Sequence, residues 1–228
     1  MANQQTTTLD QLLVPSPLPR IYTFWFQHIP SNERLLLPSP EDWMKWFFKS
    51  DEFDSACTLA SPHHPPGPTP RNIYRGESSR IGFEFFDPLA RTIAVKAGEA
   101  GYPAGSGSSS PFRYRQGQRV WFYMPLIHAE DLDMQDLARV KYAEMAEDFT
   151  SLLDGDATGL SDDEAECRRI LLENRARLEE QLKTHFRVQR EHYDPIARFG
   201  RFPHRNAALG RETSEEERRF LAEGKTFG

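Results

Sequence analysis

The pattern of apolar and polar residues along the chain is helical in its longest regular segments. From Asp131 to Leu153, apolar side chains recur mostly at steps of three and four residues, which predicts an amphipathic helix. Ser161-Asp162-Asp163-Glu164 has the sequence of a capping box and predicts the start of a long helix that runs to about Ala197. Residues 78–101 also have a helical pattern, with a restart at Asp87-Pro88. Because no segment alternates as a strand would, the predicted fold class is all-α.

Proline and glycine divide this helical pattern into a terminal arm, one domain and long loops. Residues 1–19 are polar and then punctuated by proline, which predicts a flexible N-terminal arm, and residues 20–228 are predicted to form a single helical domain. Loops are expected near residues 60–70, 101–112 and 154–160. The first of these contains five prolines, which exclude regular structure. The other two contain glycine and small polar residues.

Charge and cysteine content limit the classes of partner and compartment. The chain of 228 residues carries a formal net charge of −6 and has a pI near 5.7. These values disfavour general binding to nucleic acid or to anionic lipid. The two cysteines form no CxxC pair, which is typical of a reducing compartment. Because the sequence shows no leader pattern and no apolar run near the roughly 20 residues that span a bilayer, the predicted location is cytoplasmic.

The segment from Arg198 to Arg211 is a local positive island in an acidic chain. Four arginines and His204 lie in it, and no carboxylate occurs before Glu212. Guanidinium groups bind carboxylate or phosphate through two parallel hydrogen bonds. Pro203 is expected to stop the preceding helix, and a new turn after it would add backbone N–H donors for an anion. A second interpretation has equal weight: these arginines pair with carboxylates of neighbouring helices and only stabilise the fold.

A second set of polar residues, His128-Ala129-Glu130-Asp131, stands at the predicted start of a helix. An imidazole and two carboxylates suit general acid–base chemistry and also metal binding. Asp131 equally suits the N-cap of that helix, and Glu130 complements the positive helix N-terminus. The functional and the structural interpretation of this set therefore both stay open.

Two histidines of the long predicted helix are candidates to join that set. His185 and His192 lie seven residues apart, hence on one face, with Gln189 between them. Histidines on a helix are more often surface or hydrogen-bonded groups than metal ligands. The corresponding metal-site hypothesis uses His128, Glu130, Asp131 and His192.

A third polar segment, Pro70-Arg71-Asn72-Ile73-Tyr74-Arg75-Gly76, has two guanidinium groups and a phenol in a turn-like sequence. Its Arg-Asn pair repeats that of Arg205-Asn206, so it is a candidate for the opposite wall of one anion site. The sequence contains no Gly-x-Ser-x-Gly elbow, no Gly-x-Gly-x-x-Gly fingerprint and no P-loop. No cofactor is therefore predicted.

Together these motifs resemble the family catalogued as domain of unknown function 924, from about residue 20 onward. The motifs that carry the resemblance are Phe24-Trp25-Phe26, Trp46-Phe47, the Pro70–Gly76 segment, Asp87 with Ala90-Arg91, Tyr123-Met124-Pro125-Leu126, His128-Ala129-Glu130-Asp131 with Gln135, His192, and Arg198-Phe199-Gly200-Arg201-Phe202-Pro203-His204-Arg205-Asn206 with Leu209-Gly210-Arg211-Glu212. The resemblance implies a tetratricopeptide-like antiparallel array of helices, and it implies no particular activity.

Two features depart from the pattern of that family. Residues 61–69 stand where the family has a Leu-Asp-Gln-Phe run before Pro70, and the preceding helical hairpin is shortened. Ala129 stands where the family has serine, so one hydroxyl group is missing. These departures leave open whether the family site is retained, redirected or kept only for structure.

The first functional hypothesis is a cofactor-independent enzyme that performs acid–base chemistry on a small anionic metabolite, by elimination, isomerisation, cyclisation or hydrolysis. The predicted catalytic residues are His128, Glu130, Asp131 and His204. The predicted substrate-binding residues are Arg71, Asn72, Tyr74, Arg75, His192, Arg198, Arg201, Arg205 and Asn206. The second hypothesis is a helical binding module for acidic or phosphorylated peptides, and the third is a metal-dependent hydrolase. Assembly as a homodimer stays open.

Overall fold

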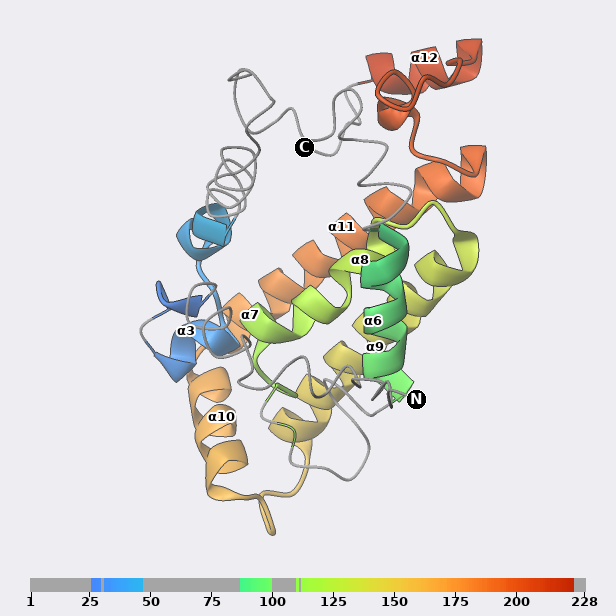
Figure 1. Ribbon diagram of the computed structural model, residues 1–228. Helices are drawn as coiled ribbons and strands as arrows, with labels where there is room; N and C mark the ends of the chain where they lie inside the picture. Colours follow the sequence, from blue (N-terminus) through green and yellow to red (C-terminus); the bar gives the residue numbers. More distant parts are fainter. Residues whose placement is uncertain (1–25, 30, 47–86, 100–109, 111, 224–228) are drawn as a thin grey trace, which may run out of the picture.

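A computed structural model describes residues 26–29, 31–46, 87–99, 110 and 112–223 of the chain (Figure 1). The regular elements among these residues are helical and none is a strand, which confirms the predicted all-α class. The elements are α3 (Asn32–Leu36), a helical stretch over residues 40–46, α6 (Asp87–Glu99), α7 (Gln116–Arg119), η3 (Val120–Phe122), α8 (Met124–Ile127), α9 (Leu132–Asp154), α10 (Asp162–Glu173), α11 (Arg175–Phe199), η4 (Pro203–Arg205) and α12 (Glu215–Ala222). No helix in these ranges has the length and apolar character to cross a membrane.

Helices α9 and α11 form the centre of the described fold. The buried face of α9 repeats at steps of three and four residues, which confirms the predicted amphipathic helix. Helix α11 lies alongside it in the opposite direction (Figure 1). Arg175 at the start of α11 pairs with Asp154 at the end of α9, and the rings of His185 and Tyr142 lie 6.0 Å apart farther along. These contacts fix the antiparallel register of the two helices.

The short helices α7, η3 and α8 pack across α9 and carry a buried charge. Arg119 has no exposed surface, and its guanidinium donates to the Asp148 carboxylate of α9 and to the Tyr123 hydroxyl, each at 2.7 Å. Arg113 donates to the other oxygen of Asp148 at 2.6 Å. Because a buried charge is tolerated only with such partners, this network holds α7 and the turn that leads into α8 against α9. The end of α8 is where the candidate site begins.

The structure corrects the predicted course of the long C-terminal helix. The capping box at Ser161 is confirmed, but the segment to Ala197 consists of two helices that meet at Asn174. The Asn174 side chain donates to the Ile170 carbonyl at 2.9 Å, four residues back. A local side-chain bond of this kind offers the backbone an alternative to continuing the helix.

The end of α11 also differs from the prediction. The helix stops at Gly200 and not at Pro203, because Gly200 adopts the left-handed conformation with φ of 69°. Pro203 instead begins the three-residue helix η4, so the expected new turn exists but is too short to present a helix N-terminus to an anion.

Several predictions concern residues outside the described ranges. These include the arm over residues 1–19, the loop at 60–70, most of the loop at 101–112 and the polar segment at 70–76. Helix α6 begins at Asp87, the predicted restart, and residues 78–86 of the same prediction lie outside. The single-domain organisation and the tetratricopeptide-like arrangement stay predictions.

Candidate functional site

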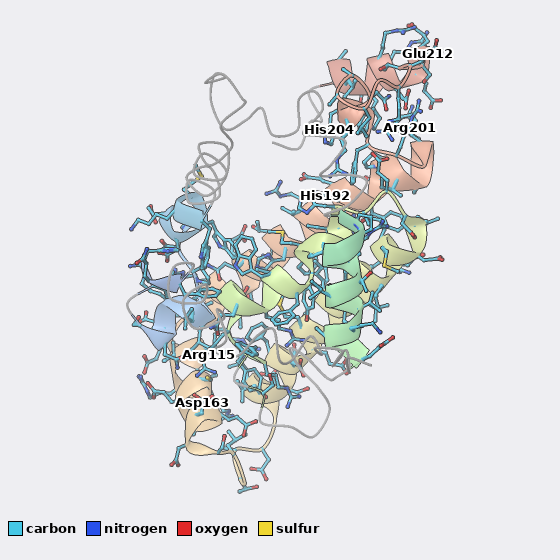
Figure 2. The ribbon with its side chains drawn as sticks, in the orientation of Figure 1. Arg115, Asp163, His192, Arg201, His204 and Glu212 are labelled. Carbon is cyan, nitrogen blue, oxygen red and sulfur yellow. The ribbon has the colours of Figure 1, made fainter. Side chains whose placement is uncertain are left out.

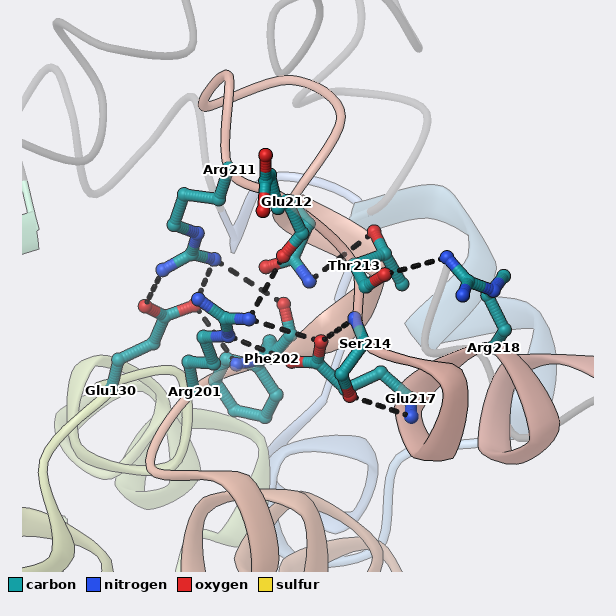
Figure 3. Close-up of polar contacts among 10 residues, drawn as sticks. Glu130, Arg201, Phe202, Arg211, Glu212, Thr213, Ser214, Glu217 and Arg218 are labelled. Carbon is teal, nitrogen blue, oxygen red and sulfur yellow. Dashed lines mark hydrogen bonds and ion pairs between the residues drawn. The ribbon is translucent and has the colours of Figure 1, made fainter.

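One carboxylate, that of Glu130, fastens the positive island (residues 198–211, called the motif below) to the turn between α8 and α9 (Figure 3). Glu130 lies in that turn with 6% of its side chain exposed. It accepts the backbone N–H of Phe202 at 2.9 Å, and it accepts two guanidinium N–H groups of Arg211 at 2.5 and 2.9 Å. Both oxygens of Glu130 are therefore engaged within the protein, and the residue holds the loop that follows α11.

A second carboxylate holds the start of the motif. Glu217 is 2% exposed and forms two hydrogen bonds with the Arg201 guanidinium, at 2.7 and 3.0 Å (Figure 3). It also accepts the Ser214 N–H at 2.7 Å and so completes the capping box of α12. The hydrogen bond from Arg201 lowers the pKa of Glu217 to about 2. Glu217 is thus a fixed anion that orders both α12 and the motif.

The structural interpretation of the positive island applies to three of its arginines. Arg201 and Arg211 pair with Glu217 and Glu130, and Arg198 pairs with Glu216 at 2.7 Å on the surface. Charge-assisted pairs of this kind neutralise the guanidinium groups without a ligand. The carboxylates that hold these arginines come from α12 and from the turn before α9.

Asp131 has the structural role that its position suggests. It is the N-cap of α9, and its side chain accepts the N–H groups of Asp133 and Met134. Arg91 of α6 approaches the other oxygen of Asp131 at 3.8 Å. These contacts hold Asp131 at the helix start.

Two histidines meet where α8 ends against α11. The rings of His128 and His192 lie 4.9 Å apart in an edge-to-face arrangement. His128 Nδ1 lies 2.7 Å from the Met124 carbonyl, and His192 Nδ1 lies 2.8 Å from the Val188 carbonyl. Because a carbonyl oxygen only accepts, each Nδ1 carries the hydrogen, and in the neutral ring each Nε2 keeps its lone pair. The pair therefore presents two nitrogen bases in a fixed tautomer.

Phe202 gathers the other groups of the site around this pair. Its buried ring lies 6.1 Å from the ring of His192 and 5.5 Å from that of His204. The guanidinium carbon of Arg205 lies 4.7 Å from the centre of the same ring, and Arg205 Nη1 donates to the His128 carbonyl at 3.1 Å. Figure 2 shows His192 and His204 at one end of the molecule, far from the Arg115–Asp163 pair at the other end.

All three imidazoles of this cluster favour the neutral form. Burial lowers the pKa of His128 to about 3, with further lowering by His192, against a raising effect of the Met124 carbonyl. Burial, and then the positive charge of Arg205, lowers the pKa of His204 to about 4. Burial also lowers the pKa of His192. At neutral pH the cluster therefore combines three uncharged imidazoles with one guanidinium.

A family model described as "Bacterial protein of unknown function (DUF924)" matches residues 68–225. The chain belongs to the DUF924 family. No curated protein and no solved structure matches it. The DUF924 match includes the histidine cluster, the two anchoring carboxylates and the segment at 70–76.

The DUF924 chain brings some predicted site residues together and leaves others undescribed. His128, His192, His204 and Arg205 form one cluster. Asn206 is buried, and its side chain donates to the Thr213 hydroxyl at 3.5 Å. The predicted residues Arg71, Asn72, Tyr74 and Arg75 lie outside the described residues.

Among the described residues of this DUF924 member, the metal hypothesis finds a histidine pair but no third ligand beside it. Glu130 is directed to Arg211 and Phe202, and Asp131 caps α9. Within the described ranges, no group of three His, Cys, Asp or Glu side chains is arranged to hold a metal ion.

Two buried glutamines of the DUF924 chain, Gln135 and Gln189, were not predicted as site residues. Glutamine is uncharged, and nothing in the sequence marks these two as buried. Gln135 of α9 has no exposed surface and donates to the carbonyls of Ile127 and Ala129, at 2.6 and 2.9 Å, on either side of His128. Gln189 lies one turn before His192 on α11 and is 4% exposed. The only available signals were the place of Gln135 in the family motif and the helical spacing of Gln189.

Proposed function

We propose that this DUF924 protein is a cofactor-independent enzyme that binds a small anion at Arg205 and moves a proton with a neutral histidine. The observation that carries the proposal is the pair of neutral imidazoles, His128 and His192, beside a guanidinium group. Neutral imidazole is the side chain best suited to general-base catalysis near neutral pH. A guanidinium group beside it suits a carboxylate or phosphate.

The proposed role of the anion is to bind and also to strengthen the base. Without an anion, burial and Arg205 hold the pKa of these histidines low, which makes them weak bases. A carboxylate or phosphate on Arg205 offsets that positive charge and favours the imidazolium form, so it raises the pKa of the nearby ring. His128 Nε2 then takes a proton from the bound molecule, while Nδ1 keeps its bond to the Met124 carbonyl. This step is common to elimination, isomerisation, cyclisation and hydrolysis.

The alternative of an acidic-peptide module receives less support. It relies on the arginines of the positive island, and Arg198, Arg201 and Arg211 already pair with carboxylates of the protein. The acidic net charge of the chain also disfavours acidic partners and nucleic acid. We therefore propose a small anionic metabolite as the partner and the cytoplasm as the location, and leave assembly as a homodimer open.

The test compares two arginines that carry the same charge in different surroundings. Arg205→Gln removes the guanidinium of the cluster, and Arg187→Gln removes an exposed guanidinium of α11 that pairs with Glu191. We expect the wild type and Arg187→Gln to bind at least one of phosphate, lactate, malate or citrate equally in calorimetry. We expect Arg205→Gln to weaken that binding by at least about tenfold. Equal binding by all three proteins would show that Arg205 does not hold the anion.

A second variant tests the proposed base. His128→Gln keeps a side chain of similar size that can donate to the Met124 carbonyl, but it removes the basic nitrogen. We expect it to bind the anion within about threefold of wild type and to lose turnover of that molecule by about a hundredfold or more. Unchanged turnover would exclude His128 as the base.

A further inference from the structure

Two glutamines, one on α9 and one on α11, each have a polar side-chain atom that is buried without a hydrogen-bond partner. These atoms are Nε2 of Gln189, a donor, and Oε1 of Gln135, an acceptor. Both side chains are more than nine-tenths buried. A buried polar group without a partner costs roughly 1–3 kcal/mol, so native proteins keep few of them. These two atoms therefore require an explanation.

The orientation of the Gln135 amide is fixed by the fold. Its nitrogen uses both hydrogens, one on the Ile127 carbonyl and one on the Ala129 carbonyl. The remaining atom is consequently the oxygen, which can only accept. Gln135 thus presents a fixed acceptor next to His128.

The register of α9 against α11 places the two glutamines near each other and near His192. Tyr142 of α9 lies against His185 of α11, and the helices are antiparallel. Seven residues, about 10 Å of helix, lead from Tyr142 back to Gln135 and from His185 forward to His192. Gln135 is therefore level with His192, and Gln189 is on the same face of α11, about one turn away.

A fixed acceptor and an unused donor complement a group that both donates and accepts. A hydroxyl group has this character, whereas a carboxylate only accepts and an ammonium only donates. Arg205, which donates to the His128 carbonyl, supplies the charge for an anion beside the histidine pair. A ligand at this cluster would therefore meet one charged group, Arg205, and one neutral polar position, formed by Gln135 and Gln189.

We propose that Gln189 and Gln135 form a hydroxyl-binding subsite, so that the substrate is a hydroxylated anion such as a hydroxy acid. This inference rests on the proposed function, since the anion is held at Arg205. In the bound state the Gln189 amide donates to the hydroxyl oxygen, and the hydroxyl donates to Gln135 Oε1. Gln189 is then a specificity-determining residue, because a site built to bond a hydroxyl rejects the analogue that lacks it.

The first experiment uses pairs of anions that differ by one hydroxyl group. Lactate is compared with propionate, malate with succinate, and citrate with tricarballylate, on wild type and on Gln189→Met. We expect the wild type to prefer the hydroxylated member of at least one pair by at least about tenfold in Kd. In Gln189→Met the preference falls to less than about threefold, while the deoxy anion binds as in wild type.

The outcomes separate this inference from the proposed function. If the wild type binds neither phosphate nor either member of any pair, the anion site itself is absent and both proposals fall. If it binds phosphate but neither member of any pair, the anion site stands and the hydroxyl subsite is wrong. If it binds both members alike, or if Gln189→Met retains the preference, the anion site stands and the hydroxyl subsite is wrong.

A second measurement needs no ligand and has a control on the same helix. Gln181 lies two turns before Gln189 and donates to the Pro38 carbonyl at 2.6 Å. We expect Gln181→Met to lower the urea midpoint of unfolding, because it removes this bond. Gln189→Met should raise the midpoint or leave it unchanged, because it removes a donor without a partner. If Gln189→Met lowers the midpoint as much as Gln181→Met does, Gln189 is a structural residue and the inference is overturned.

Discussion

The arginines of the positive island have different partners, and the burial of each partner decides how much the ion pair contributes to the stability of the fold. Arg211 meets a carboxylate that is 6% exposed, whereas Arg198 meets one that is 61% exposed. Removing one partner of a buried pair leaves an uncompensated charge. Removing one partner of an exposed pair changes little, because water screens both charges. Substitution of Glu130 can therefore be compared with the same substitution of Glu216 as its control.

Glu130→Gln should destabilise the protein strongly. The substitution leaves the Arg211 guanidinium without its counter-charge in a largely buried position, so we expect a loss of about 2–4 kcal/mol in the free energy of unfolding. The control, Glu216→Gln, should lose no more than about 0.5 kcal/mol. Urea unfolding at neutral pH measures both values. A similar small loss in both variants would mean that Glu130 does not anchor the motif.

The sequence predicted the residue types of the site but not the partners that separate their roles. It placed His128, Glu130 and the positive island among the candidates. However, the arginine that pairs with Glu130 lies 81 residues away along the chain. Whether a carboxylate anchors a loop or acts as a base depends on such contacts, which no local pattern contains. Gln135 and Gln189 were not predicted as site residues for a related reason. Their role depends on their burial in the folded protein, which the sequence alone does not show.

At the scale of elements, helix starts were easier to predict than helix ends. Asp131 and Ser161 cap helices as predicted, because a capping side chain and its N–H partners are neighbours in sequence. The break at Asn174 has no comparable signal, since asparagine is compatible with both a helix interior and a helix end. Gly200 ends α11 through its left-handed backbone, whereas the prediction used Pro203.

Two glycine substitutions test the role of Gly200 as the end of α11. A Cβ atom at Gly200 would meet no other atom within 4 Å, so its cost is that of the left-handed backbone alone. We expect Gly200→Ala to lower the free energy of unfolding by about 1 kcal/mol. Gly98 of α6 has equal space without a positive φ, so Gly98→Ala should raise it by up to about 1 kcal/mol. Urea unfolding measures both. An equal gain in both variants would contradict the assigned role of Gly200.

At the scale of the whole molecule, the buried histidines link folding to protonation. The pKa of His185 is lowered by burial to about 4, in addition to the lowered values of His128, His192 and His204. In the unfolded chain these groups take up protons near pH 6.5. Between pH 6.5 and the pKa values of the folded protein, the unfolded state binds more protons than the folded state does. The stability that the neutral histidines add is therefore fully present above about pH 6.5 and is lost as the pH falls. Glu217 contributes at lower pH: its pKa is lowered from 4.5 to about 2, so the stability that it adds is lost only as the pH falls below about 4.5.

The same linkage provides a test of the anion site in the intact protein. We expect the free energy of unfolding to fall by at least about 2 kcal/mol from pH 7 to pH 5, since each fully neutral buried histidine contributes up to about 1.4 kcal/mol per pH unit. Sulfate, which keeps its charge over this range, should reduce the fall relative to chloride at equal ionic strength, because an anion at Arg205 favours imidazolium in the folded state.

The comparison with Arg205→Gln separates specific binding from the general salting-in or salting-out effect of sulfate, which acts on both proteins alike. Sulfate should stabilise wild type more than Arg205→Gln, and the difference should grow as the pH falls, because imidazolium becomes the favoured form only when the anion is bound. Urea unfolding at several pH values measures this difference directly. A flat pH profile would contradict the burial of neutral histidines, whereas a normal profile with equal sulfate effects would contradict the anion site alone.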